Sequence, residues 1–375
     1  MELASGKLVR DEPADGVVRL RIANPERRGA LDHEILDTLA ETVAGLDARC
    51  LVLTGTGPVF SAGYDLGNLE GREFEESAEK LVAHPFHAAL EALDGRRLAV
   101  LTGAGISTDS GIPDYRGPDS PPRKPMTFQQ FVGDPAFRRH YWARNHVGWR
   151  HVGRTLPNAG HRALARLESD GIVSGIITQN VDLLHQAAGS RRVIDLHGRY
   201  DRVVCLDCGT GVSRAALAER LEALNPGFVE SVGAVADIEI APDADAVIEQ
   251  TAHFVVADCE RCGGVLKPDI VFFGESVPRE RVARAVALVE EAEALLVAGS
   301  SLTVYSGLRF VRQAAAADRP VVIVNRGTTR GDPLATVKVE AGTSETLNAL
   351  TELLPPLPAP PVEPVRPVRA DVAER

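Results

Sequence analysis

Four short apolar segments, separated by amphipathic helical stretches, constrain the fold of this chain most strongly. The segments are rich in Val, Ile and Leu, and they occupy residues 97–103, 171–180, 293–300 and 319–325. Apolar runs that alternate with helical stretches in this way are typical of a parallel sheet with helices on both faces. We therefore predict an α/β fold, a Rossmann-like doubly wound parallel sheet, within residues 84–352.

Capping residues mark the ends of the helices in this region. Asn158 precedes an amphipathic stretch that ends just before Gly171, and these residue types are favoured at the beginning and the end of a helix. A second amphipathic stretch begins at Arg281 and leads into the apolar segment at 293–300. This order predicts a helix that connects two neighbouring parallel strands.

Four of the five cysteines form two pairs, Cys205-x-x-Cys208 and Cys259-x-x-Cys262. Two such pairs are typical of a tetrahedral zinc site, and a redox-active pair is the alternative. Four thiolates leave no open position for water, so we expect a structural ion. The 50 residues between Cys208 and Cys259 exceed the spacing of about 15–20 in a compact zinc ribbon. Cys50 lies outside this set, and we expect it to be buried.

Charge and hydropathy exclude several classes of partner. The formal net charge is −11, whereas a domain that binds nucleic acid or an anionic membrane usually carries a basic face. No apolar run is long enough to span a membrane, and residues 1–16 lack the apolar core of a secretory signal. We therefore expect a cytoplasmic protein with no direct nucleic-acid or membrane partner. The sequence does not predict the oligomeric state.

Glycine-rich or polar turns follow three of the predicted strands. The first turn lacks the third glycine of the usual dinucleotide fingerprint, so by itself it fits either a dinucleotide site or a tight strand-to-helix turn. Ligands of open parallel sheets bind at the carboxyl ends of the strands, so three such turns favour a nucleotide site. The residues concerned are Gly103, Ala104, Gly105, Gly299, Ser300, Ser301, Asn325, Arg326 and Gly327.

Seven motifs in one fixed order carry a family resemblance. They are GAGIS, GIPDYRG, TQNVDLLH, LHG, the two CxxC pairs, KPDIVFFGE and GSSLTVYS. In this order they resemble the sirtuins, which are NAD-dependent protein deacylases. Residues 141–149 and 189–209 resemble more narrowly the class II, sirtuin-four-like branch. Deacetylase, ADP-ribosyltransferase and other acyl-lysine activities are described for that branch, so the subtype leaves the substrate open.

The resemblance implies two domains with an acyl-lysine site between them. A Rossmann-like core that binds NAD would comprise about residues 90–112, 158–200 and 266–352, and a smaller zinc-binding module would comprise about 113–157 and 201–265. It also implies that the acyl group moves from lysine to ADP-ribose while nicotinamide leaves. Acylated-lysine proteins are therefore the expected substrates, and NAD and zinc are the expected cofactors.

The catalytic residues that the resemblance implies are His197, Asn180 and Asp182. His197, in the LHG motif, matches the family's general base, and an imidazole suits that task because its usual pKa lies near physiological pH. Asn180 is expected to orient the ribose or a water molecule. Asn and Asp at the end of a strand also commonly cap the next helix, and we expect both roles to apply.

Further residues match the family's binding positions. Arg116 would serve the NAD diphosphate, or else be a surface residue. The segment KPDIVFFGE, an apolar strand when taken by itself, would supply an edge to which a substrate peptide adds as a strand. The implied NAD residues beyond the three turns are Ser107, Asp114, Tyr115, Arg116, Gln179, Asn180, Val181, Asp182 and Thr343, and the implied substrate residues are Val271, Phe273 and Gly274.

The two ends of the chain differ from this central region. In the first, the apolar patterns predict strands at 16–23 and 50–55 and a helix at 31–46. Residues 25–32 and 57–66 are similar to the beginning of the crotonase family, in which the backbone N–H at the position of Tyr64 forms half of an oxyanion hole. We expect residues 1–80 to be a truncated crotonase-like fragment without hydratase activity, because an oxyanion hole needs convergent donors. It is either a vestigial fusion or an acyl-CoA-sensing or oligomerising appendage. The Pro-rich residues 355–375 are expected to be a disordered tail.

Three functions are therefore open. The first is an NAD-dependent protein-lysine deacylase, the second is a protein mono-ADP-ribosyltransferase that uses the same site, and the third is a non-catalytic NAD-binding regulator. His197, Asn180 and Asp182 argue against the third. The tyrosine and arginine that hold an acidic acyl group in one branch of the family have no clear counterpart near GIPDYRG, and we do not assign that role to Tyr141 and Arg144.

Overall fold

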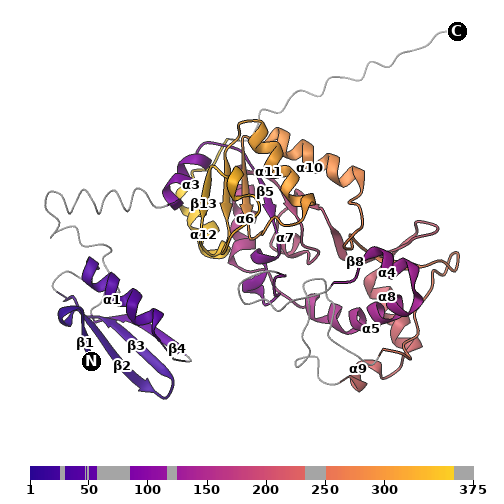
Figure 1. The fold of residues 1–375 in the computed structure, drawn as a ribbon, viewed down its shortest axis with the longest axis horizontal. Helices are drawn as coiled ribbons and strands as arrows, with labels where there is room; N and C mark the ends of the chain where they lie inside the picture. Colours follow the sequence, from indigo (N-terminus) through magenta and orange to yellow (C-terminus); the bar gives the residue numbers. More distant parts are fainter. Residues whose placement is uncertain are drawn as a thin grey trace, which may run out of the picture. The chain divides into compact units, whose positions relative to one another are not determined.

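The computed structural model describes residues 1–25, 30–46, 48, 50–56, 85–115, 125–232 and 251–358. The chain divides into two compact units, Met1–Ala83 and His84–Arg375, which we describe separately. Figure 1 labels most of the helices and several of the strands of the two units. Among the described residues, no helix is both long enough and apolar enough to cross a membrane.

The first unit is a four-stranded sheet with one helix. The strands lie in the order β1 (Glu2–Leu3), β2 (Leu8–Ala14), β3 (Val17–Ile22) and β4 (Cys50–Gly55), and helix α1 (His33–Ala44) connects β3 with β4. All neighbouring strands are antiparallel except β3 and β4, which run parallel. The predicted strands at 16–23 and 50–55 and the predicted helix at 31–46 are confirmed. Tyr64 and the segment 57–66 lie outside the described residues.

The expectation that Cys50 is buried is wrong. Cys50 is exposed at the beginning of β4, which lies at the edge of its sheet. The neighbouring apolar side chains on this strand, Leu51 and Leu53, are 41% and 44% exposed. An apolar sequence therefore predicted the strand correctly but not its position in the sheet, since an edge strand with apolar side chains is unusual for a folded protein.

The second unit is built on a six-stranded parallel sheet. The spatial order is β13 (Val337–Val339), β12 (Val321–Val324), β11 (Ala294–Ala298), β5 (Leu98–Thr102), β6 (Val173–Thr178) and β7 (Val193–Asp195). Every neighbouring pair is parallel. If the six strands are renumbered 1 to 6 in chain order, starting at β5, their spatial order from β7 to β13 is 3-2-1-4-5-6. This is the order of a doubly wound sheet. The predicted fold class is confirmed, and the strand order reverses between β5 and β11, where such sheets bind ligands.

Helices cover both faces of this sheet, as Figure 1 shows. One face packs against α3 (Pro85–Leu93), α6 (Ala159–Ser169) and α12 (Thr343–Leu353), and the other packs against α10 (Arg279–Glu291) and α11 (Tyr305–Ala316). Along β11, Leu296 belongs to the first core and Leu295 to the second, because successive side chains of a strand point to opposite faces. Burial on both faces explains why the strands are continuous apolar runs.

The predicted ends of α6 are confirmed. The side chain of Asn158 accepts a hydrogen bond from the backbone N–H of His161 at 3.2 Å. Gly171 follows the helix with φ +76°, a left-handed conformation that favours glycine. The helix predicted from Arg281 is α10, and it precedes β11 as expected.

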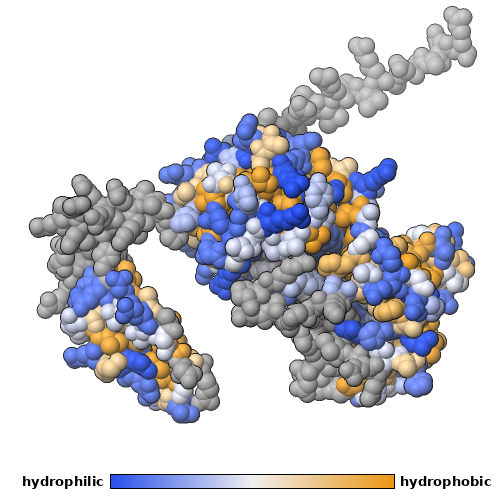
Figure 2. All heavy atoms as spheres, viewed as in Figure 1, coloured by the Kyte–Doolittle hydropathy of each residue, from blue (hydrophilic) through white to orange (hydrophobic). Residues whose placement is uncertain are grey.

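A smaller antiparallel sheet forms the rest of the second unit. Its strand order is β10 (Leu266–Ile270), β8 (Gly198–Cys205) and β9 (Gly211–Ser213), and the helices around it are α4 (Phe128–Gly133), α5 (Pro135–Val152), α8 (Arg214–Leu224) and α9 (Phe228–Ser231). An aromatic core joins α4, α5 and the segment after β10 through Phe131, Tyr141, Trp142 and Phe272. Figure 2 shows polar and apolar residues interspersed over the visible face of this unit.

Candidate active site and metal centre

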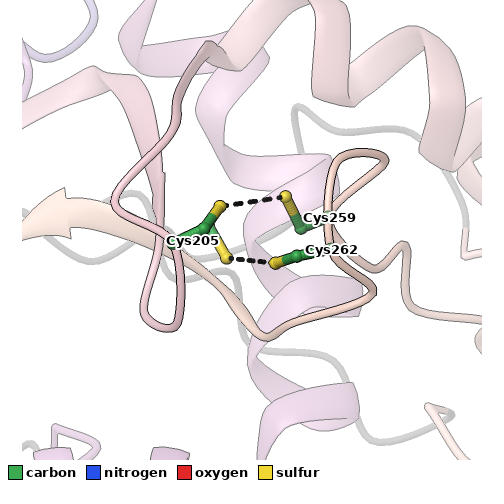
Figure 3. Close-up of side chains that lie close together, drawn as sticks. Cys205, Cys259 and Cys262 are labelled. Carbon is green, nitrogen blue, oxygen red and sulfur yellow. Dashed lines mark hydrogen bonds between the residues drawn. The ribbon is translucent and has the colours of Figure 1, made fainter.

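Four cysteine side chains, Cys205, Cys208, Cys259 and Cys262, converge beside the small sheet. Figure 3 labels three of them, Cys205, Cys259 and Cys262, whose sulfur atoms point into one cluster. The four Sγ atoms all lie within 4.8 Å of each other; Cys205 and Cys262 are 3.5 Å apart, and Cys208 and Cys259 are 3.8 Å apart. A disulfide would need an S–S distance of about 2.05 Å. A tetrahedron with Zn–S bonds of about 2.3 Å has edges of about 3.8 Å. The donor set and its spacing therefore fit zinc.

The backbone around each cysteine pair follows the same local pattern. Each CxxC is followed by a glycine in the left-handed region, Gly209 with φ +70° and Gly263 with φ +74°. The N–H of Gly209 donates to the carbonyl of Cys205 at 3.0 Å, and the N–H of Gly263 donates to that of Cys259 at 2.7 Å. Glycine tolerates this conformation without a steric cost, so the recurring CxxCG pattern folds into two matching turns that bring the sulfur atoms together.

A cavity of about 670 Å³ opens at the carboxyl ends of β5, β11 and β12. Of the residues that the sequence singles out, Thr343 does not line it, and Arg116 lies outside the described residues. The hydroxyl of Thr343 instead donates to the carbonyl of Gly105 at 3.4 Å. Those that line it are Gly103, Ala104, Gly105, Ser107, Asp114, Tyr115, Gln179, Asn180, Val181, Asp182, His197, Val271, Phe273, Gly274, Gly299, Ser300, Ser301, Asn325, Arg326 and Gly327.

The glycine turns after β5 and β11 pack directly on each other. The N–H of Gly105 donates to the carbonyl of Gly299 at 2.8 Å. A Cβ atom on Gly103 would lie 2.8 Å from that carbonyl, and one on Gly299 would lie 2.4 Å from the backbone nitrogen of Ile106. Gly299 also has φ +66°, so a side chain there would be strained as well as blocked. Both interpretations of the first turn therefore apply: it is tight, and it lines the cavity.

The segment after the first turn differs from the expectation of a helix. Two short 3-10 turns, η3 (Ala104–Ile106) and η4 (Thr108–Ser110), follow β5. The N–H of Ser107 already donates to the carbonyl of Ala104, and the N–H of Ile106 to that of Gly103. The turn therefore presents backbone and side-chain groups of single residues to the cavity rather than the open end of a long helix.

His197 lies in the cavity with both ring nitrogens hydrogen-bonded. Its Nδ1 is 3.0 Å from the carbonyl oxygen of Gln179, which can only accept, so Nδ1 carries the proton. Its Nε2 is 2.8 Å from the hydroxyl of Ser306, which therefore donates to it. Burial lowers the pKa of His197 to about 4. The ring is thus neutral at physiological pH, and the one lone pair of Nε2, which accepts the hydrogen bond from Ser306, is the position that can take up a proton.

Asn180 and Asp182 hold the backbone that surrounds this histidine. The amide of Asn180 donates to the carbonyl of Gly103 at 3.1 Å and to the hydroxyl of Ser107 at 3.0 Å. Asp182 is buried and accepts from Ser107 at 2.7 Å and from the N–H of Leu184 at 3.0 Å. Burial raises the pKa of Asp182, and these hydrogen bonds oppose that rise. The bond to Leu184 is a local turn bond to the residue two positions on. The expected helix cap is not formed, because the N-cap residue of α7 (Leu184–Ala187) is Leu183, which makes no side-chain capping bond.

The segment KPDIVFFGE is closed by an ion pair between its ends. The ammonium of Lys267, only 3% exposed, lies 3.1 Å from a carboxylate oxygen of Glu275 and also donates to backbone carbonyls of Pro268 and Ile270. Burial lowers the pKa of Lys267. Glu275 in turn accepts from the N–H of Phe272 at 2.9 Å. This closed loop presents the cavity-lining segment from Val271 to Gly274, and its geometry explains two of the three charged residues of the motif. The third, Asp269, forms an ion pair with Arg281 at 2.6 Å.

Sequence reasoning missed several residues that line the cavity. They include Ile112, Phe272, Ser276, Val277, Leu302, Thr303, Val304, Tyr305, Ser306 and Arg309. Most belong to the loop after β10 or to the loop and first turns of α11 after β11. The motif GSSLTVYS was a signal for Leu302 to Ser306, because these residues follow directly on the predicted turn Gly299–Ser301. Tyr141 lies buried in the aromatic core and does not line the cavity, in agreement with a sequence analysis that gave it no substrate-binding role.

The sequence model of the Sir2 family matches residues 103–306, from the first glycine turn through Ser306. The chain belongs to the Sir2 family. A Mycobacterium avium (strain 104) protein named NAD-dependent protein deacetylase 1 is 69% identical over 262 residues, which are 70% of this chain and 93% of that protein. A Streptomyces coelicolor protein of the same name is 54% identical over 266 residues, 70% of this chain and 88% of that protein.

Solved structures of Sir2 proteins share this fold. One described as "Structural Basis for the Mechanism and Regulation of Sir2 Enzymes" is 32% identical with a TM-score of 0.56, and it covers 72% of this chain and 97% of that one. Another, described as "Sir2-p53 peptide-NAD+", is 31% identical with a TM-score of 0.56. The alignment covers 71% of this chain and 96% of that one. The similarity to this Sir2-family chain thus extends over nearly the whole length of those proteins.

Proposed function

We propose that this chain is an NAD-dependent protein-lysine deacylase that transfers the acyl group from lysine to ADP-ribose and releases nicotinamide. One observation carries the proposal: the neutral Nε2 of His197 lies in the same cavity as the glycine turns and the segment Val271–Gly274. A base, a nucleotide site and a peptide edge therefore meet at one place. The names of the relatives, NAD-dependent protein deacetylase, point to the same chemistry.

The cavity suits NAD because polar turns from three strand ends line it. The turns Gly103–Gly105, Gly299–Ser301 and Asn325–Gly327 would hold the nucleotide, with Ser107, Asp114, Tyr115 and Gln179 beside them. When bound, NAD supplies the activated ribose carbon that receives the acyl oxygen as nicotinamide leaves. We also propose that Arg116 serves the diphosphate. Because β5 and β11 lie side by side at the point where the strand order reverses, the arrangement is the usual one for a nucleotide.

In this proposal His197 accepts a proton at Nε2 from a hydroxyl group in the cavity. The carbonyl of Gln179 fixes the proton on Nδ1, so the lone pair is always on the nitrogen that faces Ser306 and the cavity. Asn180 and Asp182 position the turn from which Gln179 projects, through their bonds to Gly103 and Ser107. A base whose pKa lies well below the working pH is fully available, although a weaker proton acceptor.

The protein substrate would enter along the loop after β10. Val271, Phe273 and Gly274 line the cavity there, and the ion pair of Lys267 with Glu275 holds the loop in shape. A peptide added as an extra strand is held mainly by its backbone, which allows many different substrate sequences. The four-cysteine zinc centre has no open position and would stabilise the small sheet to which β10 belongs.

We further propose the class II subtype, a cytoplasmic location, and a division into a Rossmann-like core and a zinc module as predicted above. The 50 residues between Cys208 and Cys259 and the class II stretches at 141–149 and 189–209 support the subtype. Reduced thiols, which a zinc centre needs, persist in the cytoplasm. The N-terminal unit is proposed to be a crotonase-like fragment without hydratase activity of its own.

Nicotinamide release tests the proposed function. Enzyme in excess over NAD should release nicotinamide in a single turnover only when an acyl-lysine peptide is present, and a panel of acetyl-, lipoyl-, succinyl- and long-chain acyl peptides should reveal the preferred group. The matching unacylated peptide is the control. Release that does not depend on the acyl group, with label from NAD remaining on protein, would instead support mono-ADP-ribosylation, and no NAD consumption would contradict both enzyme functions.

Replacing Ser306 by Ala should change the pH dependence of the reaction. The hydroxyl donates to Nε2 and so stabilises the neutral ring. Without it we expect the acid limb of kcat/KM to move to higher pH by about one pH unit, because a hydrogen bond contributes about 0.5–1.5 kcal/mol and one pH unit corresponds to about 1.4 kcal/mol. Ser306→Thr, which keeps a hydroxyl, should restore the wild-type profile. A lower rate with an unmoved acid limb would show that Ser306 only packs against the ring.

A further inference from the structure

Arg309 is a cation in the cavity wall, and no carboxylate in the described part of the chain forms an ion pair with it. It lies on α11, three residues after Ser306, and lines the cavity. Its Nε atom is buried without a hydrogen-bond partner, and among the described residues its guanidinium forms no ion pair. A buried donor without a partner costs free energy. The position therefore suggests a group that receives its partner from a ligand.

Arg309 belongs to a small basic and aromatic surface that continues outward along α11. The guanidinium carbon of Arg309 lies 5.3 Å from the ring centre of Tyr305, and that of Arg312 lies 5.6 Å from the same ring. Tyr305 is 52% exposed. The ring and the two guanidinium groups favour each other's positions through cation–π contact. We call Tyr305, Arg309 and Arg312 the α11 basic surface.

Arg326, the other described arginine that lines the cavity, belongs to a turn proposed to hold the nucleotide, and three further cations near the cavity have partners. Arg281 forms an ion pair with Asp269 at 2.6 Å, Lys267 one with Glu275 at 3.1 Å, and Arg330 donates to the carbonyl of Thr303 at 3.2 Å. The chain as a whole has a net charge of −11. A cationic surface at the edge of the cavity in an acidic protein attracts an anionic ligand, and a guanidinium group matches the geometry of a carboxylate.

We propose that the α11 basic surface binds an acidic side chain of the protein substrate close to the acylated lysine. The inference rests on the proposed function, because it assumes that a peptide reaches His197 beside Ser306. Arg309 lies about 4.5 Å further along the helix axis than Ser306, and an extended peptide advances about 3.3 Å per residue. An Asp or Glu within about three positions of the acyl-lysine would therefore reach Arg309.

The direction of the surface favours a peptide side chain over the acyl group as the source of this carboxylate. Tyr305 and Arg309 lie in the cavity wall, and the surface ends at Arg312, which is exposed and does not line the cavity. A peptide that lies across the mouth of the cavity would follow this path. An acyl group, by contrast, would point inward toward His197. The turns proposed for the NAD phosphates lie at the ends of β5, β11 and β12, on other elements than α11.

A set of matched peptides tests this inference. Each would carry one acetyl-lysine and either Glu or Gln at one position from three residues before to three residues after it. For the wild-type enzyme we expect one or two positions at which Glu raises kcat/KM about tenfold over Gln, mainly through KM, because only Glu offers a charged acceptor to the guanidinium group. Arg309→Gln should remove that preference, and Arg312→Gln should reduce it.

Arg284→Gln is the matched control, because Arg284 is an exposed arginine on α10 that does not line the cavity. It should keep the Glu preference. Equal rates for Glu and Gln at every position would overturn the inference while leaving the proposed function intact. A rise in the KM of NAD in Arg309→Gln would assign Arg309 to the cofactor, and a loss confined to succinyl- or glutaryl-lysine would assign it to the acyl group; both results would overturn it.

Binding provides a second readout that does not need turnover. The affinity of fluorescein-labelled Glu and Gln peptides can be measured by anisotropy with the full-length wild type and Arg309→Gln. We expect the Glu peptide to bind about tenfold more tightly to the wild type only. Selective binding without turnover would support the inference and contradict the proposed function. Turnover without a preference for Glu would support the proposed function and contradict the inference.

Discussion

The His197→Ala variant is expected to deacylate about 10²-fold to 10⁴-fold more slowly than the wild type, which is the range that a positioned general base contributes. The reason is that Nε2 of His197 is the neutral nitrogen that the Gln179 carbonyl and the Ser306 hydroxyl orient in the cavity. The measurement is kcat/KM for an acetyl-lysine peptide. His253→Ala is the control, because His253 is exposed and does not line the cavity. A variant that retains more than a tenth of the wild-type rate would contradict the assignment.

The pH dependence of wild-type kcat/KM should also reflect the ionisation of His197. Burial lowers the pKa of His197 to about 4, and the base works only when it is deprotonated. Activity limited by this ring should therefore be fully present above about pH 5 and fall as the pH passes through about 4. Burial also lowers the pKa values of His146 and His161 to about 4. Below pH 6.5 these rings take up protons when the protein unfolds, so acid lowers the free energy of unfolding. Circular dichroism must therefore show that the protein is still folded between about pH 4 and 5, where the activity is expected to fall.

Removal of the metal is expected to have the largest effect on stability. Zinc contributes about 10–16 kcal/mol of apparent binding free energy in small zinc-dependent domains, and most of it is folding free energy. A strong chelator, or Cys205→Ser, should therefore unfold the small sheet and abolish activity. Hydrogen exchange should accelerate in β8, β9 and β10. The core strand β5, which packs between β6 and β11, should change far less.

Metal content and one variant provide the controls. The purified protein should hold one zinc ion per chain, in agreement with four sulfur atoms within 4.8 Å of one another. Cys50→Ser should retain the zinc and the melting temperature, because Cys50 is exposed and belongs to the first unit. A protein without metal that is as stable as the native one, or a disulfide within either CxxC pair, would contradict a structural zinc centre.

The large sheet could be predicted from the sequence because strands that are buried on both faces consist almost entirely of apolar residues. Segments such as 97–103 and 319–325 are continuous apolar runs, and the helices between them have capping residues at their ends. The turns at their carboxyl ends could be assigned to one edge of the sheet, since parallel strands bring those ends together. For the same reason the positions of Gly103 and Gly299 on the cavity followed from their places after strands.

Contacts between distant residues could not be predicted in this way. The hydrogen bond between Ser306 and His197 joins two segments that are far apart in the chain, and no local pattern marks it. The same holds for the packing of Gly103 against Gly299, which makes those glycines structural as well as part of the cavity. Arg309 looked like one more polar residue on an amphipathic helix. Only the position of α11 beside the cavity distinguishes it from the other arginines.

The fate of the acyl group in a single turnover tests the central claim most directly. Enzyme in excess would be mixed with NAD and a peptide whose acetyl group carries an isotopic label, and the products would be separated and weighed by mass spectrometry. We predict one nicotinamide, one free-lysine peptide and one labelled acetyl-ADP-ribose for each NAD consumed. Label that stays on the peptide while ADP-ribose becomes attached to protein would contradict deacylation by this chain.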